Sequence, residues 1–353
     1  MSASHIGADA GSSSHPQPPL VEPEAEAQGE FEKAFAEGMA YAARARSMLG
    51  DLTNARGIYE VLMTKGAQVT GKASTYTLAA MMGLLNIFEE ETAKQRREHA
   101  PQVVAIAARM IRMCDKQEPG CEWLHEVREE GPVEVPYVGP MDARRLRLQA
   151  NAHLGSMHHE NQAYDEAIAC YDAAIEAAEA TPATANAVDV RAELVMALNG
   201  KAQCVQSLAI KAGGSTPAEA VQTTGDVERQ QTLPKDDLPD EAKKHFRSAT
   251  ELGLRALQLA RELSAEEADE NPEEAGDDDG HGPTNPMLLA VYCTLGDIAW
   301  TMRNKRLAVL NYTHAARQSI KCYGEDHPET KKALTLLSFA QSHTAVGKPV
   351  EAM

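Results

Sequence analysis

Apolar residues are spaced along most of the chain as in amphipathic helices, beginning near Phe31. In four places the pattern takes one form: an apolar or small pair, an alanine 13 residues later, and further contacts four and seven residues beyond that alanine. Residues separated by four and seven lie on one face of a helix. Each set therefore predicts two helices packed as a hairpin.

The clearest of these sets lies between residues 154 and 174. It consists of Leu154, Gly155, Ala167, Tyr171 and Ala174. Two more are Ala42, Ala43, Ala55, Tyr59 and Leu62, and Leu295, Gly296, Ala308, Tyr312 and Ala315. The intervals from Leu295 to Phe339, where the fourth set begins, and from Ala308 to Ala352 are both 44 residues. Repetition at such a period is typical of a solenoid, whose units bury their apolar faces by stacking.

A fifth hairpin is interrupted. Its first helix is predicted over residues 191–211, with Leu198 in the place of Leu154, and its second over residues 240–263. In the second helix Ala242, Phe246 and Ala249 keep the spacing of four and seven. Glycines and prolines between the two predict an inserted loop. Residues 78–91 and 103–114 predict one more hairpin, whose register relative to the others stays open.

Turn residues separate the predicted helices. Gly50 follows Ala42 by eight residues and is predicted to lie in the turn of its hairpin. Arg303 occupies the same place in the hairpin of Leu295. Gly324 is suited to end one helix, and Pro328 to begin the next with Asp326 as its cap. Asn285 and Pro286 form a second helix-start signal.

These elements predict four segments. Residues 1–28 are small, polar and proline-rich, a composition typical of a disordered tail. Residues 29–117 form N-terminal hairpins, residues 118–140 a non-helical connector, and residues 141–353 the repeats. Loops are inserted in the repeats at about 212–239 and 264–285.

Composition supports an all-α fold. Of the 353 residues 43% are hydrophobic and only 5% aromatic, which suits close-packed helices better than a β-sandwich. The net charge of −18 argues against nucleic acid and is compatible with a basic partner. Six cysteines without a CxxC pair indicate free thiols in a reducing compartment. With no signal-peptide core and no membrane-spanning run, a soluble cytoplasmic protein is expected.

The repeated residues resemble the tetratricopeptide repeat family. The Gly324-Glu-Asp-His-Pro328 junction and the 44-residue period are similar to the longer repeats of kinesin light chains. A weaker likeness is to the helical C-terminal region of SET and MYND domain methyltransferases, whose catalytic domain and zinc-binding cysteines are missing here. The resemblance implies a right-handed α-solenoid with a concave groove that binds proteins or peptides.

Six residues are candidates for the groove, because in the repeat family the matching face of each first helix lines it. They are Ser156, His159, Gln203, Asp297, Trp300 and Gln341. For Trp300, packing in the core is the alternative interpretation, since tryptophan is usually largely buried. The basic and asparagine residues of chaperone-tail-binding repeats are absent from the Leu154 and Leu295 hairpins, which disfavours acidic chaperone C-termini as ligands.

Other motifs carry less chemistry. Residues 66–73 nearly spell a phosphate-binding loop, but Ala73 replaces the hydroxyl that holds Mg²⁺ and a helix is predicted before it. His158 and His159 diverge by about 100° on a helix and cannot chelate together. We find no catalytic constellation, and we expect no cofactor and no bound metal.

The run from Glu262 to Asp279 is almost entirely acidic. Such a run is usually a solvated, disordered loop. The alternatives are an electrostatic arm for a basic partner and a segment that occludes the groove of its own chain.

The leading hypothesis is a non-enzymatic scaffold that binds a peptide or partner helix along its concave face. A second is a structural subunit of a larger assembly, cytoskeletal or motor-associated, docked through its terminal hairpins. A third is an enzyme, either a methyltransferase remnant or a nucleotide-binding protein.

Overall fold

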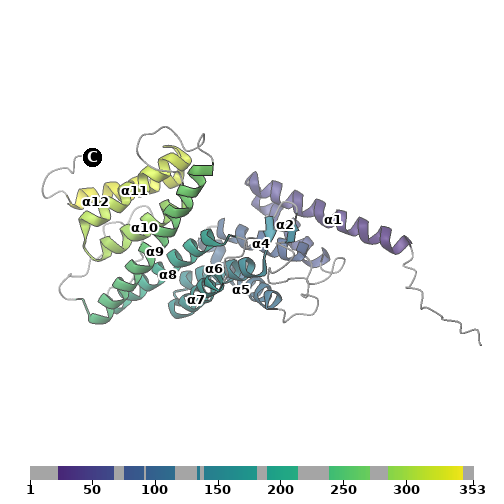
Figure 1. Cartoon of the computed structure of the whole chain (residues 1–353), viewed down its shortest axis with the longest axis horizontal. Coiled ribbons are helices and arrows are strands. Elements are labelled where there is room, and N and C mark those ends of the chain that lie inside the picture. The colour runs from purple at the N-terminus through teal and green to yellow at the C-terminus, as the bar shows by residue number, and fades with distance from the viewer. Residues whose placement is uncertain are drawn as a thin grey trace, which may run out of the picture.

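The computed structural model describes residues 23–66, 75–90, 93–115, 133–135, 139–180, 189–213, 238–270 and 285–344. The helices are α1 (Pro23–Met48), α2 (Leu52–Val61), the π-helical turn η1 (Leu62–Gly66), α4 (Thr75–Glu90), α5 (Ala93–Cys114), α6 (Ala143–Glu160), α7 (Tyr164–Glu179), α8 (Arg191–Ala212), α9 (Asp240–Glu270), α10 (Pro286–Thr301), α11 (Lys305–Tyr323) and α12 (Pro328–Thr344). Consecutive helices pack in succession from α1 at one end to α12 at the other (Figure 1). The predicted all-α solenoid is confirmed.

Three of the four predicted hairpins are present in the predicted register, and the second half of the fourth, which contains Ala352, lies outside the described residues. Leu154 and Gly155 lie in α6 and Tyr171 in α7, while α10 and α11 carry the set that begins at Leu295. The interrupted hairpin consists of α8 and α9, which pack against each other although 27 residues, 213–239, separate them along the chain. The residues between them lie outside the described part except at its two edges.

The acidic run is helical in its first part, where a loop was predicted from residue 264. Helix α9 continues to Glu270 because Leu263 and Ser264 are still buried, at 8% and 0% exposure. Beyond them Glu266 accepts hydrogen bonds at 2.7 and 2.5 Å from the guanidinium of Arg191, the first residue of α8. Residues 271–279 of the run lie outside the described residues.

Three other boundaries differ from the prediction. Helix α1 begins at Pro23, inside the segment predicted to be a tail, and α5 begins at Ala93 and contains Pro101. In the connector, β1 (Val133–Val135) and β2 (Gly139–Met141) form a short antiparallel pair with Glu134 opposite Pro140. Residues 1–22, most of the near-miss phosphate loop, and residues 345–353 lie outside the described part.

Helix caps follow the sequence at two junctions and depart from it at a third. Asn285 caps α10 by accepting from the Met287 amide at 2.8 Å, and Gly324, with φ of +82°, ends α11. Asp326 is not the cap of α12, because the Glu329 amide donates instead to Nδ1 of His327 at 3.3 Å. The carboxylate of Asp326 pairs with Lys331 at 3.6 Å.

The turns inside three hairpins share a left-handed residue. Gly50, Gln162 and Arg303 each follow the first residue of their set by eight positions and have φ of +76°, +61° and +58°. Only glycine adopts this conformation without strain. The three hairpins therefore share the left-handed turn, although only one of the three has a glycine at that position.

In two places a tyrosine packed on glycine connects one hairpin to the next. A Cβ built on Gly155 would lie 2.8 Å from the ring of Tyr171, and one on Gly200 of the following hairpin would lie 2.4 Å from the same ring. Tyr59 meets Gly83 of α4 in the same way, at 2.3 Å. No side chain fits between ring and backbone at these distances, so the helices approach closely only because the glycines are there.

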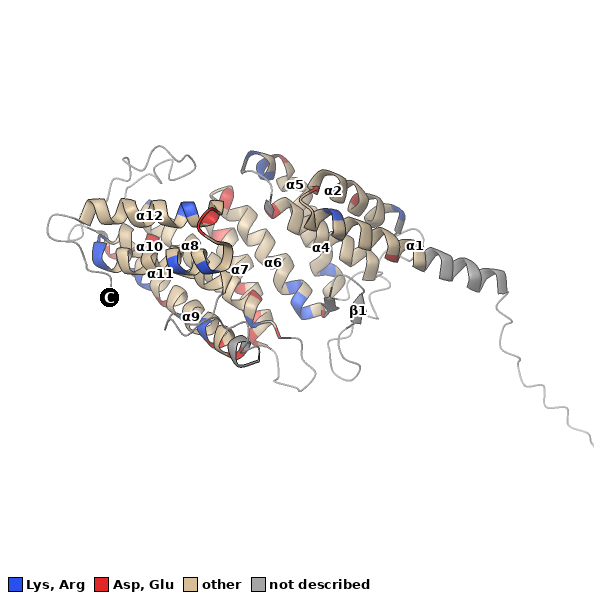
Figure 2. Ribbon diagram, turned by 90° about the horizontal axis from the view of Figure 1, so that it is seen from above, with Lys and Arg blue, Asp and Glu red and all other residues tan. Residues whose placement is uncertain are grey.

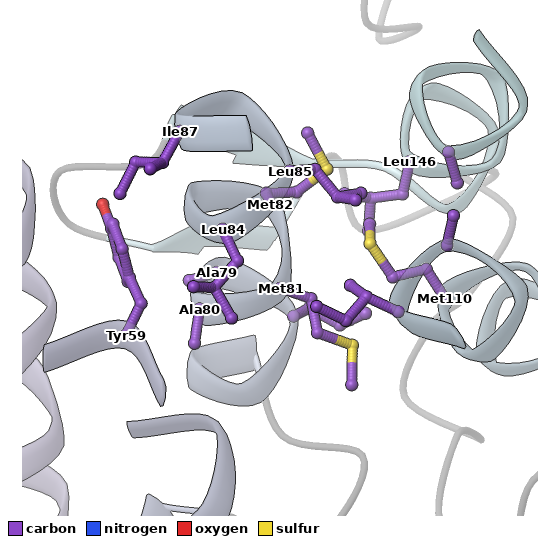
Figure 3. Packing of buried hydrophobic residues seen from close by; sticks show 14 of the residues in the cluster. Tyr59, Ala79, Ala80, Met81, Met82, Leu84, Leu85, Ile87, Met110 and Leu146 are labelled. Carbon is purple, nitrogen blue, oxygen red and sulfur yellow. The ribbon is translucent and has the colours of Figure 1, made fainter. Parts of the chain in front are cut away.

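In the N-terminal hairpins the core forms around α4, whose residues are almost all buried. Figure 3 shows Met81, Met82 and Leu85 of this helix extending toward Met110 of α5 and Leu146 of α6, with Tyr59 on the other side. Since α4 is apolar all round, it lies inside the stack rather than on its surface.

We expect Gly200→Ala to lower the free energy of unfolding by about 1–3 kcal/mol, because the added methyl group overpacks the contact with Tyr171. The matched control is Gly57→Ala in α2, where no atom lies within 4 Å of the added Cβ. There the same change should raise stability by about 0.5–1 kcal/mol through helix propensity. Urea unfolding of both variants measures the difference, and equal effects would contradict the packing role.

Candidate inner surface of the solenoid

The first helices of successive hairpins form one layer. Helices α6, α8 and α10 contact one another directly, whereas the described parts of α7, α9 and α11 make no comparable contact, apart from an ion pair between Arg255 and Glu179. When one layer of a stack is more closely spaced than the other, the stack curves toward it. We call the free side of α6, α8 and α10 the inner surface.

Polar side chains join these helices across the inner surface. The His159 ring of α6 lies 3.2 Å from Ser207 Oγ of α8, and the Gln203 amide of α8 donates to Thr294 of α10 at 2.9 Å. Gln206 donates to Thr301 at 3.1 Å. Burial lowers the pKa of His159, so its imidazole is neutral near pH 7. Two of the predicted groove residues thus hold the inner layer together.

Asp297 is the most electrostatically perturbed of the predicted groove residues. Its carboxylate, half-buried on α10, accepts a hydrogen bond from the Tyr312 hydroxyl at 2.6 Å. Burial raises its pKa to about 6, although the Tyr312 bond and the charge of Lys332 act in the opposite direction. The acid therefore bridges the two helices of its hairpin and changes charge near neutral pH.

Trp300, a predicted groove residue for which core packing was the alternative, is buried against α12. Its side chain is only 6% exposed and packs against Phe339 of α12 with ring centroids 5.0 Å apart. Its indole N–H has no hydrogen-bond partner among the described residues. The register places residue 300 on the edge of the inner face, and α12 covers that edge. Gln341 lies exposed on α12.

An apolar row on the same face was not predicted. Leu154, Leu198, Leu295 and Phe339 occupy the same position in their hairpins. The residues two places before them are Ala152, Met196, Cys293 and Leu337. Met196 is 48% exposed and the other three are half-buried. On a helix, the residue two places before this position lies on the same face as the residues two and five places after it. The register of the repeats was therefore sufficient to find the row.

Beside this row, a charged cluster joins α6 to α8. Arg145 Nε donates to Glu193 Oε1 at 2.5 Å, and the Gln149 amide donates to the same oxygen at 3.1 Å. The second oxygen of Glu193 is buried without a partner among the described residues. The cluster orients α8 on α6.

A cleft of about 220 Å³ opens near Ser156, between α4, α5 and α6. Its floor is apolar, from Leu85, Phe88, Val103 and Met157, and its polar lining includes Glu89, Arg96 and His153. His153 Nδ1 lies 2.8 Å from Glu89 Oε1. Burial favours a higher pKa for Glu89, but the bond and charge of His153 and the charge of Arg96 outweigh it. Typical small-molecule sites are about 300–1,000 Å³, so this cleft suits a side chain better than a cofactor.

The hairpin of α6 and α7 carries the family signal. Residues 148–181 match the tetratricopeptide repeat. The match begins in α6, covers α7, and includes Leu154, Gly155, Ala167 and Tyr171. It also spans Ala152, Ser156 and His159, so part of the inner surface belongs to the matched repeat. No curated protein matches the chain.

Two further findings concern chemistry and membranes. Among the described residues, no three His, Cys, Asp or Glu side chains come together in a way that would hold a metal ion. None of the helices in the described ranges is long and apolar enough to cross a membrane.

Replacing Asp297 should change how stability depends on pH. Because the pKa of Asp297 is raised in the folded protein, its contribution is present below the unfolded pKa of 3.8 and is lost as the pH rises through about 6. Asp297→Asn keeps an acceptor for Tyr312 without the charge. We expect the unfolding free energy of the variant relative to wild type to rise between pH 4 and pH 7, by on the order of 1–3 kcal/mol. A difference that is constant with pH would contradict the assignment.

Trp300→Ala should destabilise the protein by about 3–5 kcal/mol, because it leaves a cavity between α10 and α12. Trp300→Phe keeps most of the contact and removes the unpaired N–H, so its cost should be clearly smaller. Thermal unfolding compares the two, and an unchanged midpoint for the alanine variant would restore the groove interpretation.

Proposed function

We propose that this protein is a non-enzymatic scaffold whose inner surface binds an extended peptide or a helix of another protein. A tetratricopeptide repeat indicates protein–protein interaction. The observation that carries the proposal is the apolar row from Ala152 through Met196 to Cys293 on the inner layer, bordered by polar residues. An interaction surface of this kind combines a partly apolar centre with a polar rim.

The charges on this surface favour a ligand with basic or neutral residues. Glu193 and Asp297 lie beside the apolar row, and the whole chain carries a net charge of −18. An acidic ligand would place like charges together at a cost in affinity.

The cysteine chemistry supports a role without catalysis. Burial raises the pKa of Cys293, on the inner surface, and of Cys204 beneath it to about 12. At neutral pH both are thiols, which are poor nucleophiles compared with thiolates. The near-miss phosphate loop follows α2 and η1 rather than a strand, as a phosphate-binding loop would require.

A second candidate is a structural subunit docked through its ends, in a cytoskeletal, motor-associated or other assembly. Helix α12 has the register of a first helix and packs on α10 through Phe339, while Leu334 remains 39% exposed on it. A partner helix packed on this side of α12 would cover Leu334. A chain recovered from native extract only in a stoichiometric complex would favour this candidate over the first.

Met196→Glu tests the inner surface. The change places a charge in the apolar row without disturbing the core, so affinity for peptides selected on the wild-type protein should fall at least about tenfold. The control is Leu310→Glu on the outer helix α11, where the residue is 52% exposed. Calorimetric titration measures both. Equal affinities for wild type and Met196→Glu, with an intact circular dichroism spectrum, would place the binding site elsewhere.

A further inference from the structure

The cleft beside Ser156 lies at the first helix of the inner surface. Residues of α4, α5 and α6 line it, and its volume is about 220 Å³. Ser156 is one of them, and it follows Ala152 of the apolar row by four residues on α6. Residues four apart lie one above the other on a helix face. The apolar row therefore reaches the edge of the cleft.

The floor of the cleft is apolar. Leu85 and Phe88 come from α4, Val103 from α5 and Met157 from α6. In Figure 2 most of α4 and α6 is tan, without charge. A long side chain with a polar end gains by laying its methylene groups on such a floor while its end stays at the rim.

The carboxylate of Glu89 stands at the rim with one oxygen open. Among the side chains of α4 that the structure describes, it is the only charged one. Nδ1 of His153, whose side chain is 8% exposed, lies 2.8 Å from Oε1 of Glu89. The Glu89 side chain is still 55% exposed, and in the described part of the chain its Oε2 makes no ion pair or hydrogen bond. A buried histidine therefore orients a carboxylate that can accept a further donor.

The guanidinium at the cleft is already engaged. Arg96 of α5 donates from Nη1 to the backbone carbonyl of Glu89 at 2.8 Å, and its Nε lies 2.7 Å from Oε1 of Glu160. The charges of Arg96 and of the exposed Arg97 act on Glu160. Arg96 also acts on Glu89, but their side chains form no ion pair. An acidic ligand group would meet two carboxylates and an engaged cation, whereas a basic group would meet the open oxygen of Glu89.

We propose that this cleft takes a lysine side chain of the peptide or helix that binds along the inner surface, so the assignment rests on the proposed function. The methylene chain of the lysine lies on the apolar floor, and its ammonium group donates to Oε2 of Glu89. Arginine fits less well, because a guanidinium pairs with carboxylates through two parallel bonds and His153 already holds the other oxygen. An anchor side chain in a pocket at one end of the row fixes the register of the ligand.

Peptides selected from a random-sequence library on the wild-type protein serve as the probe. We expect them to share a lysine at one position. Replacing that lysine by norleucine keeps the methylene chain and removes the charge, so affinity for wild type should fall at least about tenfold. With Glu89→Gln the same replacement should change affinity less than about threefold, because the carboxylate that the lysine uses is absent.

Calorimetric titration measures these affinities, and circular dichroism checks that Glu89→Gln is folded. Glu166→Gln, at an exposed carboxylate in the first turn of α7, is the matched control and should keep the tenfold difference. Selected peptides without a shared lysine, or an equal effect of norleucine on wild type and Glu89→Gln, would overturn the lysine site.

The Met196→Glu variant separates the two proposals. If it weakens binding while norleucine has no effect, the inner surface stands and the lysine site is overturned. If it leaves the affinity unchanged, the proposed function itself is overturned. A library from which the wild-type protein enriches no peptide would overturn both.

Discussion

The contact on which the stack depends is a tyrosine ring lying against glycine backbone. Tyr171 touches Gly155 in its own hairpin and Gly200 in the next, so one side chain sets both the spacing within a unit and the spacing between units. Tyr59 and Tyr312 occupy the same place in their hairpins. Because ring and backbone leave no room for a methyl group, the helices have little freedom to slide, and the inner layer keeps the close spacing that creates its surface.

The interrupted hairpin shows that packing between two helices, rather than a short connection, holds them together as a hairpin. Helices α8 and α9 pack as a pair although a long segment separates them in sequence. The length of a connecting loop costs little additional entropy once it is long, whereas each buried helix face contributes directly. Helix α9 accordingly extends past residue 264, where a loop was predicted, because Leu263 and Ser264 are buried and Glu266 pairs with Arg191.

The inner surface combines polar and apolar side chains. On the inner surface, polar groups such as His159 and Gln203 are used to join neighbouring helices, and the apolar row between them is narrow. The proposed binding of a peptide would use both kinds of contact, since an interaction surface of this kind combines a partly apolar centre with a polar rim.

The sequence by itself determined the elements and their register, because spacings of four, seven and 13 residues are local properties of helices and short turns. Leu154, Ala167 and Tyr171 lie where that register predicts. Only the tertiary structure decided which residues on a correct face remain accessible: α12 covers Trp300, while nothing described covers Met196. Accessibility depends on the neighbour that packs over a side chain, and a periodic pattern locates a face without showing what lies upon it.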